Sequence, residues 1–436
     1  MQAVSPCTVS YHELMMLNFF PLFIFLNMDI IKRLSDKREW TAFLEYKLEK
    51  DNDSKKELED LKIFVEREEY IPVAKKIQRG ELLSPPKKLL ISKSGSTKKR
   101  TVYSFSREEN YALKLISFML KEYDGVFAPN LYSFRVERGV KNAIERLQSV
   151  KNLSQYYTYK VDISSYFNSA NVAVTMLELK KVLEQDEELY DFFNRLLNDK
   201  RVEFDGKIID EEKGILPGVP TANFLANLYL RDLDFYFMKK RILYLRYSDD
   251  IIVFSKTEEK LNEYVTIIKD FLKKRNLSIN HSKEKRTAPS ESWDFLGYSY
   301  CNGKIDICES SLKKLKAKMK RKMRALSRWA SKKQLPNEKA VVAFIRKFNA
   351  KFFDNPIRNE LTWTRWYFPI INTTKGLETI DEYMQECIRC LATGKRTNAK
   401  YAFRYEQIKS LGYRNLVHEY YKFKSESKES EENLTI

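Results

Sequence analysis

The sequence has few cysteines, no long apolar run and no internal repeat, and the first two absences each argue against a class of protein. Its five cysteines are scattered and form no dense, even set, which argues against a disulfide framework and favours a reducing cytoplasm. The apolar stretch at residues 14–26 contains Asn18 and Pro21 and has no basic residue before it. It is shorter than the roughly 20 residues that cross a bilayer, so we expect neither a membrane anchor nor a secretory signal.

Cys387 and Cys390 have the spacing of half a zinc site. The other half would have to be Cys301 and Cys308, whose separation is too wide for an ordinary zinc knuckle. Buried free thiols are therefore the favoured interpretation, and zinc is the less favoured one.

Negative charge is scarce: 78 Lys and Arg face 60 Asp and Glu, which gives a formal charge of +18. An excess of this size predicts a polyanionic partner, most simply nucleic acid. The shortage is greatest at residues 311–333, which contain no acidic residue, while Leu312, Leu315 and Met319 recur at helical intervals. We expect a helix there with one packed face and one cationic face. A solvated surface helix is the alternative.

The most informative stretch is Tyr247-Ser248-Asp249-Asp250, which lies between two apolar runs at 242–246 and 251–255. The runs are rich in β-branched and aromatic residues, so they predict a tight β-hairpin with adjacent aspartates at its tip. Two neighbouring carboxylates repel each other, and a divalent cation such as Mg²⁺ would neutralise them. Taken alone, the tetrapeptide could equally be a solvated turn.

A third carboxylate, Asp162, has a matching setting upstream. It ends a short run rich in Tyr, Thr and Val, which predicts a strand, and a turn with serines and aromatics follows. Together with Asp249 and Asp250 it could hold two metal ions around an in-line displacement at phosphorus.

At these residues the chain resembles the reverse transcriptases, and five short motifs follow the order of that family. They are Asp162 with Phe167, residues 216–227, Tyr247 to Asp250, residues 280–283 and residues 295–298. The resemblance implies an α/β right-hand polymerase, with fingers, an antiparallel palm sheet plus helices, and an all-helical thumb with a C-terminal extension.

The resemblance also implies roles for individual residues. The catalytic and metal-binding set would be Asp162, Asp249, Asp250 and the backbone of Ile163, holding two Mg²⁺ ions or Mn²⁺. The nucleotide-binding set would be Lys93, Arg100, Ser165, Tyr166, Phe167, Pro217, Gly218 and Lys283. The nucleic-acid-binding set would be Arg135, Tyr247, Phe295, Leu296, Gly297, Lys318, Lys320, Arg321 and Arg324.

For two of these residues the sequence allows a different role from the one that the resemblance implies. Arg135 could bind phosphate or form a structural salt bridge. Phe167 aligns with the aromatic residue of the family that excludes ribonucleotides, whereas its neighbour Tyr166 should turn to the opposite side and stabilise the palm.

The sequence departs from the common family pattern at Pro217-Gly218, where most members have Gln-Gly. This departure is similar to bacterial defence-associated and abortive-infection reverse transcriptases. The expected function is then RNA-directed DNA synthesis from deoxynucleotides in antiviral defence, in the cytoplasm, with a noncoding RNA template and a DNA product. Alternatives are a retron or intron-type enzyme, an untemplated or protein-primed DNA polymerase, an RNA-dependent RNA polymerase and a non-enzymatic RNA-binding scaffold. The sequence does not decide whether the protein forms a homo-oligomer.

The expected domain organisation has five parts. Residues 1–27 would be an upstream leader outside the fold, 28–79 an N-terminal helical segment and 80–306 the fingers and palm. Residues 307–423 would be the thumb and its extension, and the Ser/Glu-rich residues 424–436 a disordered tail.

Overall fold

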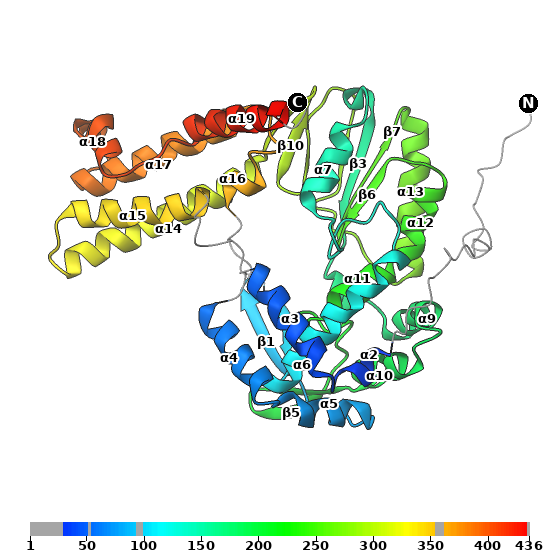
Figure 1. Ribbon diagram of the computed structural model, residues 1–436. Helices are drawn as coiled ribbons and strands as arrows, with labels where there is room; N and C mark the ends of the chain where they lie inside the picture. The colour runs from blue at the N-terminus through cyan, green and yellow to red at the C-terminus, as the bar shows by residue number, and fades with distance from the viewer. Residues whose placement is uncertain (1–28, 51–53, 93–98, 354–361, 434–436) are drawn as a thin grey trace, which may run out of the picture. The chain divides into compact units, whose positions relative to one another are not determined.

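The computed structural model describes residues 29–50, 54–92, 99–353 and 362–433 (Figure 1). These residues form two compact units. Of these described residues, unit 1 comprises 29–49, 54–92, 99–143 and 156–286, and unit 2 comprises 50, 144–155, 287–353 and 362–433. The predicted leader and Lys93 lie outside the described residues.

Several helices of unit 1 begin with a side chain that caps the first turn. Ser54 accepts a hydrogen bond from the Glu57 N–H, and Ser106 accepts one from the Glu109 N–H. Ser106 and Glu109 do not form a reciprocal capping box, because the Glu109 carboxylate accepts from Lys76 and Ser84. The helices and 3₁₀ turns are α2 (Ile30–Arg33), α3 (Lys37–Lys50), α4 (Lys55–Glu66), α5 (Tyr70–Gln78), α6 (Arg107–Met119), η1 (Leu120–Val126), α8 (Tyr166–Ser169), α9 (Val172–Val182), α10 (Glu187–Asn198), α11 (Ala222–Tyr229), α12 (Arg231–Lys239) and α13 (Glu258–Lys274).

The first sheet of unit 1 has the strand order β2-β1-β4-β5. β1 (Lys87–Ser92) and β2 (Lys99–Ser104) form an antiparallel hairpin, with Lys87 opposite Ser104. β4 (Arg201–Phe204) and β5 (Lys207–Asp210) form a second antiparallel hairpin.

The second sheet has the order β6-β7-β3-β8 and corresponds to the predicted palm. Its strands are β3 (Tyr157–Asp162), β6 (Tyr244–Tyr247), β7 (Asp250–Ser255) and β8 (Lys285–Thr287), and both β3 and β6 pair with β7 in antiparallel fashion. Ile251, Ile252 and Val253 are fully buried, so β7 is covered on both faces. This burial explains why its sequence is continuously apolar rather than alternating.

Unit 2 begins with a small sheet of order β11-β10-β9. Its strands are β9 (Trp293–Phe295), β10 (Tyr298–Cys301) and β11 (Lys304–Ile307). Leu296 and Gly297 connect β9 to β10 with φ values of 51° and 93°. Positive φ at both residues is what a two-residue turn of the hairpin type requires, and glycine adopts it at little cost.

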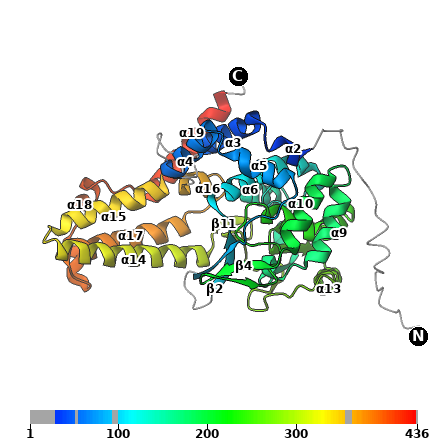
Figure 2. The ribbon, with the colours of Figure 1, turned by 90° about the horizontal axis from the view of Figure 1, so that it is seen from below.

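The rest of unit 2 is helical among its described residues. The long helices α14 (Glu309–Lys332), α15 (Asn337–Phe352) and α17 (Lys375–Thr393) lie side by side (Figures 1 and 2). The other elements are α7 (Val140–Gln148), which starts in unit 1, η2 (Leu153–Gln155), α16 (Trp363–Trp366), η3 (Asn398–Ala402), α18 (Tyr405–Ser410) and α19 (Leu416–Asn433).

Residues 424–433, expected from the sequence to belong to a disordered tail, continue α19 in this structure. Polar side chains support this helix locally, since the Ser425 and Ser427 hydroxyls donate to carbonyls one turn earlier. Lys422 and Glu426 also form an i,i+4 ion pair at 3.8 Å.

The fold class expected from the sequence is confirmed: fingers and palm built from antiparallel hairpins and helices precede a helical C-terminal part. No helix among the described residues is both long and apolar enough to span a membrane.

The cysteines are only partly as expected. Cys308 and Cys387 are buried free thiols, but Cys301 is exposed. Burial raises the pKa of Cys387 to about 12, so this thiol stays protonated at neutral pH.

Candidate active site in unit 1

Three carboxylates lie at one edge of the palm sheet. Asp162 is the last residue of β3 and Asp250 is the first residue of β7. The strand register places these two residues opposite each other, and the Ile163 N–H donates to the Asp249 carbonyl at 3.1 Å. One strand pair thus brings together the two motifs that the sequence singled out.

Buried polar groups behind the β6–β7 turn hold it in place. Ser248 has a φ of 57°, in the left-handed region, and its N–H donates to Ser133 Oγ at 2.8 Å. The Arg246 guanidinium donates to the Ser248 carbonyl at 3.2 Å and to the Asn227 carbonyl at 3.0 Å. Arg246 also makes a two-pronged ion pair with Asp234. These contacts fix the backbone that carries Asp249 and Asp250.

Arg246 and Asp234 belong to the positioning residues that sequence reasoning missed. Their side chains are 0% and 1% exposed. Burial alone would lower the pKa of Arg246, but Asp234 raises it above its ordinary value, so the guanidinium stays charged. The available signal was a charged residue at the end of an apolar strand, because a buried charge requires a partner.

The carboxylates repel one another. Burial, followed by the neighbouring charges of Asp162 and Asp250, raises the pKa of Asp249 to about 6. Lys283 offsets part of this charge, since its Nζ lies 2.7 Å from Asp162 Oδ2, and Asn280 donates to Oδ1 at 3.2 Å. Burial alone would lower the pKa of Lys283, but the aspartates, Asp162 above all, raise it.

The donor chemistry of this edge fits Mg²⁺ or Mn²⁺. The candidate ligands are oxygens, which these hard cations prefer, and a divalent ion would relieve the repulsion that raises the pKa of Asp249. Within the described ranges no three His, Cys, Asp or Glu side chains are already gathered into a metal-holding group. Asp162 would have to exchange its contact with Lys283 for such an ion.

Tyr166 and Phe167 lie on the short helix α8 rather than on the extended turn that the sequence suggested. The side chain of Tyr166, which the resemblance assigned to the nucleotide-binding set, is buried, and its hydroxyl donates to the Ala226 carbonyl. Phe167 is only partly buried, so of these two aromatic rings it is the one with more surface available to a ligand.

The backbone around Phe167 has a left-handed residue on its N-terminal side and is contacted closely by residues 214 and 215. Ser165, which precedes α8, is exposed and has a φ of 49°. The Ile215 N–H donates to the Phe167 carbonyl at 2.9 Å. Gly214 has a φ of 58°, and a Cβ there would overlap that same carbonyl oxygen. A glycine is therefore required just before the motif at residues 216–227.

The predicted nucleotide-binding residues Pro217 and Gly218 lie against β2. The Pro217 carbonyl accepts a hydrogen bond from the Tyr103 N–H at 2.8 Å. Gly218 has a φ of 95°, and a Cβ there would come within 3.0 Å of the Tyr103 carbonyl oxygen. Arg100 is exposed on β2, opposite Ile91.

Arg135 takes its alternative role. Its guanidinium forms an ion pair with Asp124, donates to the Ala128 carbonyl at 3.0 Å and has a side chain 4% exposed. In this structure Arg135 therefore holds the segment that supplies Ser133, and its guanidinium is engaged with Asp124. Tyr247 is partly buried, with its ring 6.4 Å from that of Phe134.

The remaining candidates belong to unit 2. Phe295, which the resemblance assigned to the nucleic-acid-binding set, is fully buried. Leu296 and Gly297 form the turn that follows it. Lys318, Lys320, Arg321 and Arg324 are all exposed on α14, whose buried face includes Leu315, Met319 and Leu326.

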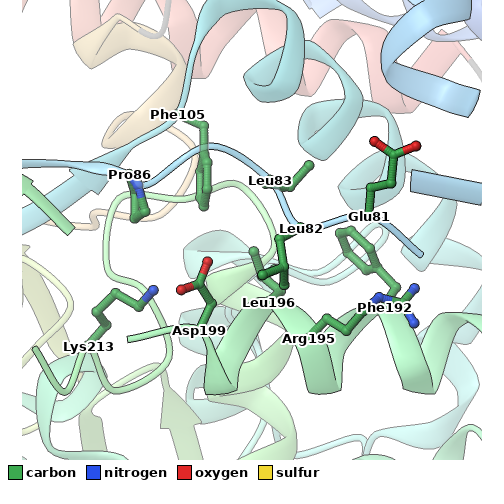
Figure 3. A pocket seen from close by; sticks show the side chains of 10 residues that line it. All are labelled: Glu81, Leu82, Leu83, Pro86, Phe105, Phe192, Arg195, Leu196, Asp199 and Lys213. Carbon is green, nitrogen blue, oxygen red and sulfur yellow. The ribbon is translucent and has the colours of Figure 1, made fainter. Parts of the chain in front are cut away.

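A separate cavity of unit 1 lies between the segment at residues 81–86 and α10 (Figure 3). Its volume of about 10 Å³ would hold roughly one water molecule. Lys213 extends toward Asp199 at its margin, and burial lowers the pKa of this lysine. None of the predicted site residues lines the cavity, so the candidate site is the sheet edge.

Both aspartate motifs lie within the part of the chain that matches a known protein family. Residues 91–300 match the family model for reverse transcriptase (RNA-dependent DNA polymerase). No curated protein matches the sequence.

Solved structures of yeast telomerases resemble the chain. Apo telomerase from Candida tropicalis has 13% sequence identity and a TM-score of 0.45 over 75% of this chain. The same telomerase truncated from its C-terminal domain has 14% sequence identity and a TM-score of 0.41 over 52% of this chain. Telomerase from Candida albicans in complex with a fragment of telomeric RNA has 13% sequence identity and a TM-score of 0.41 over 77% of this chain. The chain covers 60%, 56% and 62% of these three chains, respectively.

Proposed function

We propose that the reverse transcriptase domain at residues 91–300 makes this chain an RNA-directed DNA polymerase, which adds deoxynucleotides to a 3′ hydroxyl. The observation that carries the proposal is the register of β3 and β7, which sets Asp162 opposite Asp250 beside Asp249. The new bond joins the 3′ oxygen to the α-phosphorus of the nucleotide, and pyrophosphate leaves.

Asp162, Asp249 and Asp250, with the backbone of Ile163, are the residues that would hold two Mg²⁺ ions, or Mn²⁺. Such ions stabilise negative charge on the reacting phosphates and lower the pKa of an attacking hydroxyl. The buried contacts of Arg246 and Ser133 keep the β6–β7 turn fixed. Positioning of this kind supplies much of the rate in a reaction that needs little acid–base chemistry.

Lys283 has a second part in this proposal. Its ammonium group lies 2.7 Å from Asp162 and its side chain is 58% exposed, so it can release the carboxylate and reach a ligand phosphate. Phe167 is proposed to lie against the sugar and exclude a 2′ hydroxyl. Arg100, exposed on β2, is proposed to bind the triphosphate.

The finer assignment rests on the sequence. Pro217-Gly218 in place of Gln-Gly supports a bacterial defence-associated enzyme that copies a noncoding RNA into DNA. The scattered cysteines support a cytoplasmic location.

A non-enzymatic RNA-binding scaffold is the competing function, and the charge of +18 favours it as much as it favours a polymerase. The two differ in what they require of the carboxylates. A scaffold gains nothing from three aspartates at one partly buried edge of a sheet, whereas a polymerase depends on them.

Asp249→Asn tests the proposal because it keeps the shape and removes the charge. We expect incorporation of a deoxynucleotide on an RNA template to fall by at least about a hundredfold, since a neutral amide balances a cation poorly. Binding of the template should persist.

The matched control is Asp270→Asn, the same change at an exposed carboxylate of α13 in unit 1. It should leave incorporation unchanged. Wild-type protein that binds RNA but incorporates nothing, or Asp249→Asn protein that polymerises normally, would favour the scaffold.

A further inference from the structure

A basic groove lies between α14 and α15 of unit 2, outside the candidate active site. Its volume is about 920 Å³, and Lys322 and Trp329 of α14 line one wall. The other wall is a single face of α15, with Lys339, Arg346 and Lys347 among its lining residues. The positions on α15 recur at intervals of three and four residues, so they form one stripe along the helix.

The groove concentrates positive charge without balancing it. Four of its lining residues are cationic and one, Glu338, is acidic. None of the four cations makes an ion pair with a residue in the described part of the chain. Burial and the nearby charges of Lys318 and Lys347 lower the pKa of Lys351 at one end of the same helix face. Like charges held this close favour a bound anion with several charges.

Trp329 gives the groove a second property. Its side chain is 41% exposed, although tryptophan is usually well buried, and no ring contact with another described residue involves it. Val342 and Ala343 are lining residues of the opposite helix and leave room beside the indole. A flat exposed ring among cations suits a ligand that alternates phosphates with aromatic bases, and bases stack on such rings when they are unpaired.

We propose that this groove binds an unpaired stretch of RNA, with one base stacked on Trp329 and the phosphates along Lys322, Lys339, Arg346 and Lys347. A duplex fits less well, because its bases are stacked inside and only its phosphates are available. The choice of RNA rests on the proposed function: during copying the RNA template has an unpaired stretch, whereas the DNA product is paired as it forms.

The test measures binding of a short fluorescent oligouridine by anisotropy, without metal or nucleotides. Trp329→Ala should weaken binding about tenfold, the loss expected for one stacked base, and Trp329→Phe should restore most of it. Wild-type tryptophan fluorescence should be quenched by RNA more than that of Trp329→Phe. Because no catalysis is involved, the result does not depend on whether the aspartates polymerise.

Two sets of control variants separate the groove from general surface effects. Arg346→Gln with Lys347→Gln should flatten the salt dependence by about 0.7 per lost contact, the single-strand value. Lys395→Gln with Lys409→Gln removes two exposed cations of unit 2 that do not line the groove, and it should have less effect. Tyr421→Ala removes an aromatic ring 61% exposed on α19 and should leave binding unchanged.

Three outcomes would overturn the proposal. Trp329→Ala could bind oligouridine as tightly as wild type, it could weaken binding of an RNA duplex as much as binding of the unpaired strand, or it could weaken binding of unpaired DNA more than that of unpaired RNA. Circular dichroism of each variant shows whether a loss of binding reflects a loss of fold.

Discussion

The carboxylate edge of unit 1 and the basic helices of unit 2 both concentrate charge of one sign, but they hold it differently. At the sheet edge the side chains are partly buried, and a fixed network of Arg246, Asn227 and Ser133 supports them. On α14 the cations are exposed on a long helix that packs through its opposite face. The sheet edge should therefore depend on each of its residues, whereas the binding of anions to α14 should be shared among many cations.

This difference predicts how each region responds to substitution. Removing one buried partner leaves another charge uncompensated at low dielectric, which is costly. Removing one exposed lysine changes a sum of small contributions that salt already screens.

The largest expected effect follows from breaking the buried ion pair behind the active-site turn. Arg246→Met should destabilise the protein by about 3 to 5 kcal/mol, because Asp234 would remain buried without its partner. The measurement is the free energy of unfolding in urea. Lys260→Met breaks an exposed ion pair of the same unit and should cost less than about 1 kcal/mol.

A double variant, Arg246→Met with Asp234→Leu, sharpens the comparison. Removing both charges should recover much of the lost stability, since a buried pair often contributes little beyond what apolar residues supply. Equal costs for Arg246→Met and Lys260→Met would show that the sheet edge is not held by its buried network.

The sequence predicted the aspartates of this sheet edge, but it did not predict the residues that hold them in place. Asp162, Asp249 and Asp250 were identifiable because each lies beside an apolar strand, and local patterns of that kind survive folding. The contacts of Ser133 with Asn227 and Ser248 join residues 94 and 115 positions apart. No local pattern pairs such positions, so these partners became visible only in the fold.

Conformation also decided cases that composition left open. The left-handed Ser165 starts helix α8, which buries Tyr166 and leaves Phe167 partly exposed, although the two aromatic rings are adjacent in sequence. Residues 424–433 have the composition of a tail, yet they continue α19 because the preceding residues already form a helix that packs through Tyr420 and Phe423. Extending a helix costs less than starting one.

A smaller effect is expected at the aromatic ring beside the carboxylates. Phe167→Ala should change the preference for deoxynucleotides over ribonucleotides by at least about tenfold, or about 1.4 kcal/mol, if the ring excludes a 2′ hydroxyl. Tyr166→Ala is the matched control, since this buried ring should affect stability instead. The measurement is single-nucleotide extension with each sugar. An unchanged ratio in Phe167→Ala would remove the support for a DNA product.

The smallest effects are expected on α14, where charge is distributed. Lys320 and Arg324 are exposed and lie four residues apart, so they share one face of the helix. If that face contacts the phosphates of a product duplex, changing both to Gln should lower the salt slope of duplex binding by about one unit per lost contact. Each single change should give about half of that shift, because distributed charges act nearly independently.

Lys313 provides the control on the same helix, since it is already paired with Glu309 at 2.6 Å. Its change to Gln should lower the slope less than the change at Lys320, because its charge is partly neutralised before nucleic acid arrives. The measurement is duplex affinity at several salt concentrations. A slope that is unchanged in the double variant would assign the exposed face of α14 to solvent, and a complete loss of binding from one substitution would mean that this helix, like the sheet edge, depends on single residues.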